Sequence, residues 1–351
     1  MSEKIRIGFV GVGGMGQCAH LRNYATLGDC EVVAIAEVRP ELGQRVAQKY
    51  LVPKVYTDLG EMLSKEKLDG IVASQQFTRH GTLVPELLEY KKPVFTEKPI
   101  AGSIEQGEKI LKALTASGTW HMVGYHKRSD PATRYAKAQI EKFVASGELG
   151  KMKYVRALMP AGDWIASGFN DMVQSNDPQP NLQWDPPASD MDKETNDKYI
   201  TFVNYYIHQV NLIRHLLGES YQFDYADPAG VLAVGHSSSG IPVSLEMSPY
   251  CTTLDWQEQY LVCFEKGWVK IELPAPVALN RPGKTTIYCD PGNGVAPIET
   301  VPQLPWVHAM RQQAQNFIDS IKGLCKPPCE AAEALEDLKV ARQYIKLWTG
   351  K

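Results

Sequence analysis

The sequence contains no long apolar run, no basic arm and no large excess of one charge. Its 351 residues are 44% hydrophobic and 22% charged, and the net charge is −3. A nearly neutral chain gives no reason to expect a nucleic acid or an anionic membrane surface as a partner. No segment approaches the roughly 20 apolar residues that a membrane-spanning helix needs. The length fits about two domains of roughly 150 residues each.

The cysteines form no framework either. There are seven of them, an odd number without regular spacing, which argues against a disulfide scaffold. Cys325 and Cys329 lie close together, but no second pair of metal ligands accompanies them. We therefore interpret them as isolated thiols and predict no metal site. The first residues lead into an apolar strand without a charged and apolar leader, so the expected location is cytoplasmic.

Strands and helices alternate at short spacing in the N-terminal part of the chain. This alternation predicts a doubly wound parallel sheet, that is, a Rossmann domain over residues 1–125. In such a sheet, ligands bind at the carboxyl ends of the strands. The apolar runs predict strands at 5–12, 31–37, 69–74, 93–99 and 121–126, and the intervening periodicity predicts helices at 16–28, 40–50, 80–90 and 103–117.

The pattern changes after about residue 130. A helix over 131–146, a strand over 151–160 and an irregular segment over 160–198 precede a helix over 203–217. Several strands then follow without helices between them, which indicates antiparallel pairing. We predict an α+β domain over 126–351 with a mainly antiparallel open sheet. One face of that sheet is expected to form a homodimer or a larger homo-oligomer.

A glycine-rich turn follows the first strand and opens a helix. Its GxGxxG spacing allows a tight turn, a close approach of the backbone to a pyrophosphate and close packing of helix on strand. The phosphates would lie at the helix N-terminus. The predicted cofactor contacts in this turn are Gly11, Gly13, Gly14 and Met15, with Gly16 as the last glycine of the motif.

An acid at the end of the second strand indicates which dinucleotide binds. Glu37 is placed to accept hydrogen bonds from ribose hydroxyls and to repel a 2′-phosphate, which favours NAD. Arg39 lies two residues later and is suited to a 2′-phosphate, so NADP stays open. Ser74 and Gln75, after the third apolar strand, are further predicted cofactor contacts.

A lysine with an acid before it and a proline after it ends another strand of the same sheet. Lys98 is suited to hold a substrate oxygen and share its proton, because burial and nearby positive charge lower a lysine pKa. Glu97 would orient that ammonium group or contact the nicotinamide ribose. Taken alone, Glu97-Lys98-Pro99 would also fit an ordinary strand end at the surface.

These features together resemble the Gfo/Idh/MocA oxidoreductases, NAD(P)-dependent dehydrogenases of sugars and polyols. The resemblance rests on the glycine motif, the acid after the second strand and His80 ahead of the Glu-Lys-Pro turn. It implies that His80 is a cofactor contact. It covers essentially the whole chain, because the segments GYHKRSDP (124–131), SGELGKMKYVRA (146–157) and IHQVNL (207–212) also resemble the family's pattern.

The resemblance implies that His208 is catalytic and faces Lys98 across the substrate. An imidazole titrates near neutrality and suits the removal of an alcohol proton. Many relatives carry an aspartate four residues earlier, where this sequence has Asn204. An amide orients the ring but does not stabilise an imidazolium. The main base is therefore either His208 or Lys98.

The substrate implied by the resemblance is a carbohydrate or a glycoside. The predicted substrate contacts are Tyr125, His126, Arg128, Trp164 and Asn204. Aromatic ring faces next to polar groups suit a sugar. Alternatively, Arg128 belongs to a structural ion pair, and the irregular segment that contains Trp164 covers the protein or contacts another subunit.

Three functions are consistent with the sequence. The first is an NAD-dependent dehydrogenase that oxidises a secondary hydroxyl of a sugar, polyol or glycoside, the C3 hydroxyl included. The second is a glycoside hydrolase or lyase with tightly bound NAD that is reduced and reoxidised in each cycle. The third and weakest is a non-catalytic NAD(H) sensor, for which no DNA-binding motif is found.

Overall fold

The chain forms two compact units, and segments distant in the sequence contribute to each. The structure, a computed structural model, describes residues 3–178 and 181–351. The sequence pattern places residues 167–178, 181–196 and 310–338 in the second domain, whereas in the structure they pack with the N-terminal residues. The first unit comprises Met1–Tyr125, Ser167–Asn196 and Met310–Leu338, and the second comprises His126–Ala166, Asp197–Ala309 and Lys339–Lys351.

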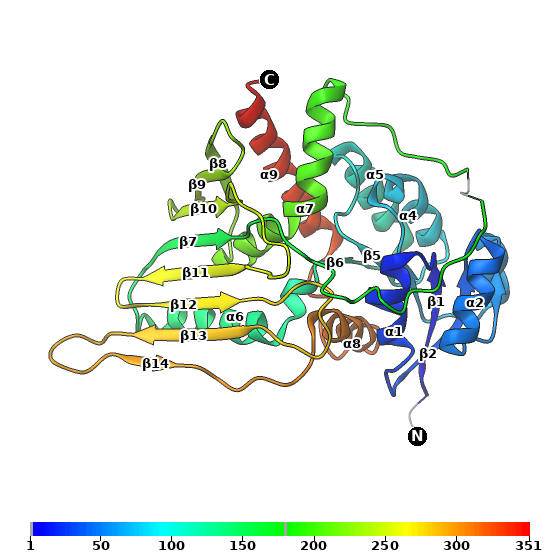
Figure 1. Cartoon of the computed structure of the whole chain (residues 1–351), viewed down its shortest axis with the longest axis horizontal. Helices are drawn as coiled ribbons and strands as arrows, with labels where there is room; N and C mark the ends of the chain where they lie inside the picture. The colour runs from blue at the N-terminus through cyan, green and yellow to red at the C-terminus, as the bar shows by residue number, and fades with distance from the viewer. Residues whose placement is uncertain (1–2, 179–180) are drawn as a thin grey trace. The chain divides into compact units, whose positions relative to one another are not determined.

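A six-stranded parallel sheet forms the centre of the first unit (Figure 1). The strand order is β3-β2-β1-β4-β5-β6, and every neighbouring pair is parallel. The order reverses between β1 and β4, which is where such sheets bind ligands. The predicted doubly wound sheet is confirmed. Its strands are β1 (Ile5–Val10), β2 (Cys30–Ala36), β3 (Val55–Tyr56), β4 (Gly70–Ala73), β5 (Val94–Glu97) and β6 (His121–Gly124).

Helices and turns connect these strands. The helix expected over 16–28 ends earlier and begins with a π-helical turn, a geometry that often accompanies ligand sites. Residues 310–338, from α8 (Ala309–Ile321) into α9 (Ala331–Thr349), belong to the same unit. The elements are η1 (Gly16–Leu21), α1 (Arg22–Tyr24), α2 (Pro40–Tyr50), α3 (Leu59–Lys65), η2 (Phe77–Arg79), α4 (His80–Glu89), α5 (Ile104–Ser117), α8 (Ala309–Ile321) and α9 (Ala331–Thr349).

The core of the first unit is completed by a residue from the C-terminal part of the chain. Phe317 on α8 is fully buried and packs against three aromatic rings. Its ring centroid lies 5.8 Å from that of Phe95, 6.3 Å from Tyr24 and 5.4 Å from Trp120. Such aromatic contacts stabilise a core beyond the burial of their area.

An eight-stranded sheet forms the second unit, in the order β14-β13-β12-β11-β7-β10-β9-β8. Only β7 and β10 pair in parallel, so the predicted mainly antiparallel sheet is confirmed. The strand β14 was not predicted. The strands are β7 (Met152–Leu158), β8 (Tyr221–Ala226), β9 (Leu232–Ser237), β10 (Pro242–Glu246), β11 (Gln259–Phe264), β12 (Gly267–Glu272), β13 (Lys284–Cys289) and β14 (Ile298–Thr300).

Helices cover this sheet within the second unit. The short turn η3 (His126–Ser129) leads into α6 (Pro131–Ser146), which packs on β12 and β13. Phe143 of α6 contacts Phe264 at 6.0 Å between ring centroids. Helix α7 (Lys193–Leu217) contributes Phe202, whose ring lies 4.5 Å from that of Tyr344 on α9. Among the described residues, no helix has both the length and the apolar character needed to cross a membrane.

We expect Phe317→Ala to destabilise the protein by about 3–5 kcal/mol, because the substitution leaves a cavity among three aromatic rings. Urea unfolding followed by fluorescence measures the loss. Leu324→Ala is the matched control: Leu324 is 72% exposed, so its removal should change the unfolding free energy by less than about 0.5 kcal/mol. Equal effects of the two substitutions would contradict the packing of α8 in this core.

Candidate active site

The glycine turn after β1 has the geometry of a dinucleotide cradle. Gly11 has φ = +84°, and a Cβ there would lie 1.9 Å from the Gln75 side chain. A Cβ on Gly16 would lie 2.7 Å from the carbonyl oxygen of Gly11. At Gly13, by contrast, the nearest atom to an added Cβ is an Arg39 nitrogen at 3.8 Å. The turn thus requires glycine at positions 11 and 16 for its own packing. It leaves open space beside Gly13, where a pyrophosphate would fit.

Glu37 stands next to this turn, just after β2. Only 3% of the residue is exposed, and its Oε2 accepts a hydrogen bond from the Val12 amide at 2.9 Å. Arg39 donates from Nε to Oε1 at 2.8 Å and from a terminal nitrogen to Oε2 at 3.1 Å. The carboxylate raises the pKa of Arg39, because the hydrogen-bonded ion pair favours the charged guanidinium. The arginine is thus already held by a carboxylate.

Residues 167–178, here called the strap, run along the same edge of the sheet. Figure 1 shows them in green, passing α1 and α2. Gln17 of η1 donates to the carbonyls of Val12 at 2.8 Å and Val173 at 3.0 Å, and accepts from the Val173 amide at 2.9 Å. A Cβ on Gly14 would lie 3.1 Å from Phe169. The strap therefore lies against the glycine turn that follows β1.

Ion pairs hold the strap to two helices. Asp171 pairs with Arg22 of α1 and with Lys49 of α2, the second at 3.0 Å. Hydrogen bonds from Lys49 and Arg22 lower the pKa of Asp171, because they favour the carboxylate. Arg45 of α2 adds a 2.9 Å hydrogen bond to the Gln174 carbonyl.

Two aspartates from this part of the chain cap helices that lack a cap of their own. The N-cap residues of α2 and α4, Arg39 and Arg79, make no side-chain capping bond. Asp177 accepts from the Leu42 amide of α2 at 2.8 Å. Asp185 accepts from the Gly81 amide of α4 at 2.7 Å. Each carboxylate satisfies N–H groups at the positive end of a helix.

The Glu-Lys-Pro turn ends β5 at the carboxyl edge of the sheet. Glu97 is buried and lies 2.6 Å from Nε2 of the buried His20, a partner that the sequence did not reveal. Its other oxygen accepts from the Lys98 amide at 3.1 Å. Lys98 is half-buried, and its bond to Pro99 is cis. Glu97 thus fixes the backbone from which the lysine side chain extends.

The predicted cofactor residue His80 is fully buried at the start of α4. Its Nδ1 lies 3.2 Å from the Pro99 and Ile100 carbonyl oxygens, and its Nε2 lies 3.3 Å from that of Gln75. Burial lowers the pKa of His80, because a charged ring loses its solvation there. The ring joins the loops after β4 and β5, and the Ser74 amide bonds to the Val10 carbonyl at 3.0 Å.

His208 lies on α7 in the second unit and is 7% exposed. Its ring meets that of His126, at a centroid distance of 4.4 Å and an angle of 76°. Asn204 is exposed one turn earlier on the same helix. The structure thus brings together two residues that the sequence assigned to catalysis and to substrate binding.

The other predicted substrate residues differ in their surroundings. Arg128 is buried, and its Nε donates to Oδ1 of Asn211 at 2.6 Å, which fastens η3 to α7. Tyr125 is 2% exposed at the end of the N-terminal segment of the first unit. Trp164 is half-buried, and its carbonyl accepts from the Val277 amide at 3.2 Å. Their predicted roles stay predictions.

A buried ion pair in the second unit was not predicted from the sequence. Lys127 donates to the carboxylate of Glu258, and both side chains are almost completely buried. Glu258 also accepts from Gln209 at 2.8 Å, from the Tyr260 hydroxyl at 2.6 Å and from Trp256 at 3.1 Å. Burial lowers the pKa of Lys127, and Glu258 opposes that effect. The network ties α7 to β11.

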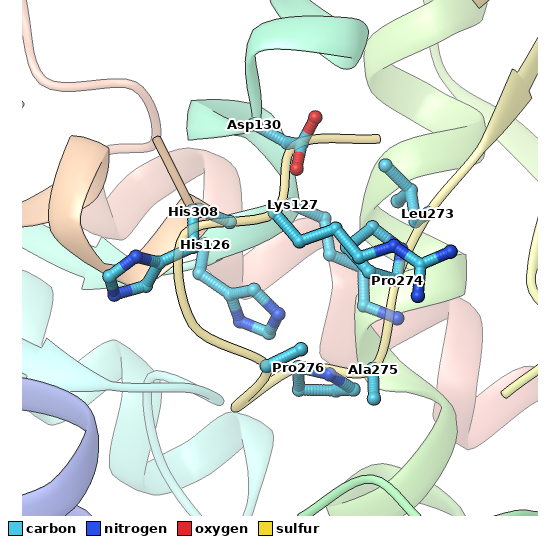
Figure 2. Close-up of a pocket in the computed structure, with 11 residues that line it drawn as sticks. His126, Lys127, Asp130, Leu273, Pro274, Ala275, Pro276 and His308 are labelled. Atoms are coloured by element: carbon cyan, nitrogen blue, oxygen red, sulfur yellow. The ribbon is translucent and has the colours of Figure 1, made fainter. Parts of the chain in front are cut away.

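A small pocket of the second unit borders this network (Figure 2). Its wall contains His126, Lys127, Asp130, Arg281, His308 and the loop residues 273–276 and 278. Asp130 accepts from the Ala132 amide at 2.8 Å and the Gly283 amide at 3.0 Å. Burial raises the pKa of Asp130 to about 6. Within residues 3–178 and 181–351, no cluster of three or more histidine, cysteine or acidic side chains is arranged to hold a metal ion.

Comparison with protein families identifies the N-terminal part. Residues 5–125 match the family model GFO_IDH_MocA, described as an oxidoreductase family with an NAD-binding Rossmann fold. The resemblance stated from the sequence is thereby confirmed for these residues. The open space beside Gly13, together with Glu37 after β2, fits such a dinucleotide.

Individual proteins extend this similarity. The myo-inositol 2-dehydrogenase of Thermotoga maritima is 24% identical over 64% of this chain and 58% of its own length, so the match spans little more than half of that relative. The inositol 2-dehydrogenase of Burkholderia lata is 26% identical over 81% of this chain and 78% of its own. The WlbA dehydrogenase of Bordetella pertussis, solved with NADH and UDP-GlcNAcA, has the same fold, with 19% identity and a TM-score of 0.67 over 99% of this chain and 97% of its own.

We expect Gly13→Ala to weaken NADH binding at least about tenfold, a loss of about 1.4 kcal/mol, because the methyl group would enter the space for the pyrophosphate. Its melting temperature should stay near that of the wild type. Gly11→Ala is the contrasting variant, because its positive φ and crowded Cβ position should lower the melting temperature. NADH fluorescence titration and thermal unfolding measure both effects. Unchanged NADH affinity in Gly13→Ala would contradict the cradle.

Glu258→Ala should destabilise the protein by about 3–5 kcal/mol, because Lys127 would remain as an uncompensated buried charge. The matched control is Glu272→Ala, which removes the partner of Lys270 in a half-exposed pair at 3.2 Å. Its loss should stay below about 1 kcal/mol. Urea unfolding of both variants makes the comparison, and similar losses would show that the buried pair has no special role.

Proposed function

We propose that this protein is an NAD-dependent dehydrogenase, because residues 5–125 match the model of an oxidoreductase family with an NAD-binding Rossmann fold. It oxidises a secondary hydroxyl of a sugar, polyol or glycoside to a ketone. The observation that carries the proposal is the shared edge of the parallel sheet: the glycine turn follows β1 and Lys98 follows β5, so the phosphate cradle and a half-buried lysine extend from the same side.

The residues have distinct parts in this reaction. Bound NAD supplies an acceptor for the hydride that leaves the substrate carbon. Lys98 holds the substrate oxygen and shares its proton, and Glu97 fixes the lysine backbone through the 3.1 Å bond to its amide. His208 accepts the hydroxyl proton, and the His126 ring at 4.4 Å supports the position of the imidazole. Asn204 and Arg128 contact the substrate.

The surroundings of Glu37 support NAD rather than NADP. The carboxylate is buried beside the turn and bonds to the Val12 amide. A 2′-phosphate there would add negative charge next to a carboxylate. Arg39, the group suited to receive that phosphate, already pairs with Glu37 through two nitrogens.

The relatives and the chemistry support the proposed substrate class. Two relatives are inositol dehydrogenases, and one neighbour in fold was solved with a sugar nucleotide. A ring that carries secondary hydroxyls is common to these compounds. Proton acceptors next to a hydride acceptor suit any such hydroxyl, and the C3 hydroxyl of a glycoside is included in the proposal.

One observation favours a second candidate, a glycoside hydrolase or lyase that keeps its NAD bound. The strap lies against Gly14 and is held by the two ion pairs of Asp171. A segment fastened over the phosphate cradle would slow the release of the cofactor. An enzyme that oxidises and re-reduces its substrate within one cycle requires such retention.

The test is NADH formation, followed by absorbance, with purified protein, NAD and a panel of inositols, sugars and glycosides. We expect turnover with at least one panel member and a loss of about 100-fold or more in Lys98→Ala and in His208→Ala. Lys109→Ala, at an exposed lysine of α5, is the control and should keep full activity.

The outcomes separate the candidates. NADH formation that persists in Lys98→Ala would refute the role of the lysine. Disappearance of a glycoside without net NADH, with NAD copurifying, would replace the dehydrogenase by the hydrolase or lyase. Absence of any NAD binding would refute both.

A further inference from the structure

The first turn of α2 is occupied by a carboxylate that comes from far away in the sequence. Asp177 Oδ2 accepts from the Leu42 amide at 2.8 Å, and its Oδ1 accepts from the Glu41 amide at 3.3 Å. The Ser175 hydroxyl donates to Oδ2 at 2.7 Å and holds the carboxylate in place. Despite partial desolvation, these bonds and the charge of Arg39 lower the pKa of Asp177, so it is ionised at neutral pH.

The N-terminus of α2 is where the 2′-phosphate of NADP would bind. The adenosine ribose of a bound dinucleotide meets the acid at the end of β2, here Glu37. A phosphate on its 2′ position would carry about two negative charges. A guanidinium and the free amides of a helix N-terminus are the groups that would bind this phosphate. Arg39 and the first amides of α2 are the groups of those kinds next to Glu37, and both kinds already have carboxylate partners.

We propose that Asp177 is a second determinant of cofactor choice and excludes NADP by standing in for the 2′-phosphate. Glu37 acts through its pair with Arg39, and Asp177 acts through the first amides of α2. An incoming 2′-phosphate must displace Asp177 from its amides or lie beside two carboxylates. Either course disfavours NADP, whereas NAD leaves both carboxylates undisturbed. This inference rests on the proposed use of NAD.

The strap explains how a residue so distant in sequence reaches α2. Gln17 holds Val173 by two side-chain bonds, and Arg45 holds the carbonyl of Gln174. The Asn176 amide donates to Glu41 at 3.4 Å. Residues on both sides of Ser175 are thus attached to η1 and α2, and Asp177 is delivered to the helix N-terminus by a fixed segment.

The experiment measures the dissociation constants of NADH and NADPH by fluorescence titration of the full-length protein, without turnover. Asp177→Asn removes the charge and keeps the size of the side chain. We expect it to tighten NADPH binding at least about tenfold, with a change of less than threefold for NADH. Asp185→Asn is the matched control, because Asp185 caps α4, which follows β4 rather than β2. It should leave the ratio of the two constants unchanged.

The outcomes test the role of Asp177 and the proposed function separately. A ratio in Asp177→Asn that stays within twofold of wild type, with NADH still bound, would overturn the inference and leave the proposed function intact. An equal change in Asp185→Asn would overturn it as well, since loss of a helix-capping carboxylate away from α2 would then suffice. Wild-type protein that binds neither cofactor would refute the proposed function and the inference together. If Asp177→Asn melts early, Asp177→Ser, which retains a capping oxygen without charge, replaces it.

Discussion

Backbone N–H groups at the carboxyl edge of the parallel sheet need acceptors, and much of the first unit is organised around that need. The Val12 amide bonds to Glu37, the Leu42 amide to Asp177 and the Gly81 amide to Asp185. Each acceptor is a carboxylate, and each helix that starts at this edge presents the positive end of its dipole. The edge therefore has a strong affinity for negative charge. The chain's own carboxylates satisfy part of it and leave the turn beside Gly13 for a ligand.

The second unit meets a different constraint, because it places charge in its interior. Lys127 and Glu258 are both almost fully buried. Gln209, Tyr260 and Trp256 also donate hydrogen bonds to the carboxylate. A buried ion pair contributes little net stability, but it is costly to disturb, so it enforces one arrangement of the groups that make it. Gln209 directly follows His208, so this arrangement also fixes the part of α7 that carries the imidazole.

Local patterns in the sequence predicted the features that depend on neighbours along the chain. The glycine turn, Glu37 and Glu97-Lys98-Pro99 follow strands that hydrophobic runs reveal, and the structure has those strands in the expected parallel sheet. Asp177, Glu258 and Phe317 could not be found in this way. Asp177 caps α2, Glu258 pairs with Lys127 and Phe317 packs on aromatic rings, each across more than 100 residues. Nothing in the local spacing points to these contacts. A weak signal for the capping aspartates did exist: α2 and α4 begin without a capping side chain, which implies acceptors from elsewhere.

The position of Phe317 bears on how the chain is made. A ribosome releases the parallel strands first, yet the ring that packs against Phe95, Tyr24 and Trp120 emerges only when most of the chain has been synthesised. Domains usually fold as they emerge from the ribosome. Here, however, the N-terminal sheet keeps an apolar face uncovered until the second unit has been translated and Phe317 is available. The nascent protein should thus depend on chaperones more than a chain whose Rossmann domain is continuous in sequence.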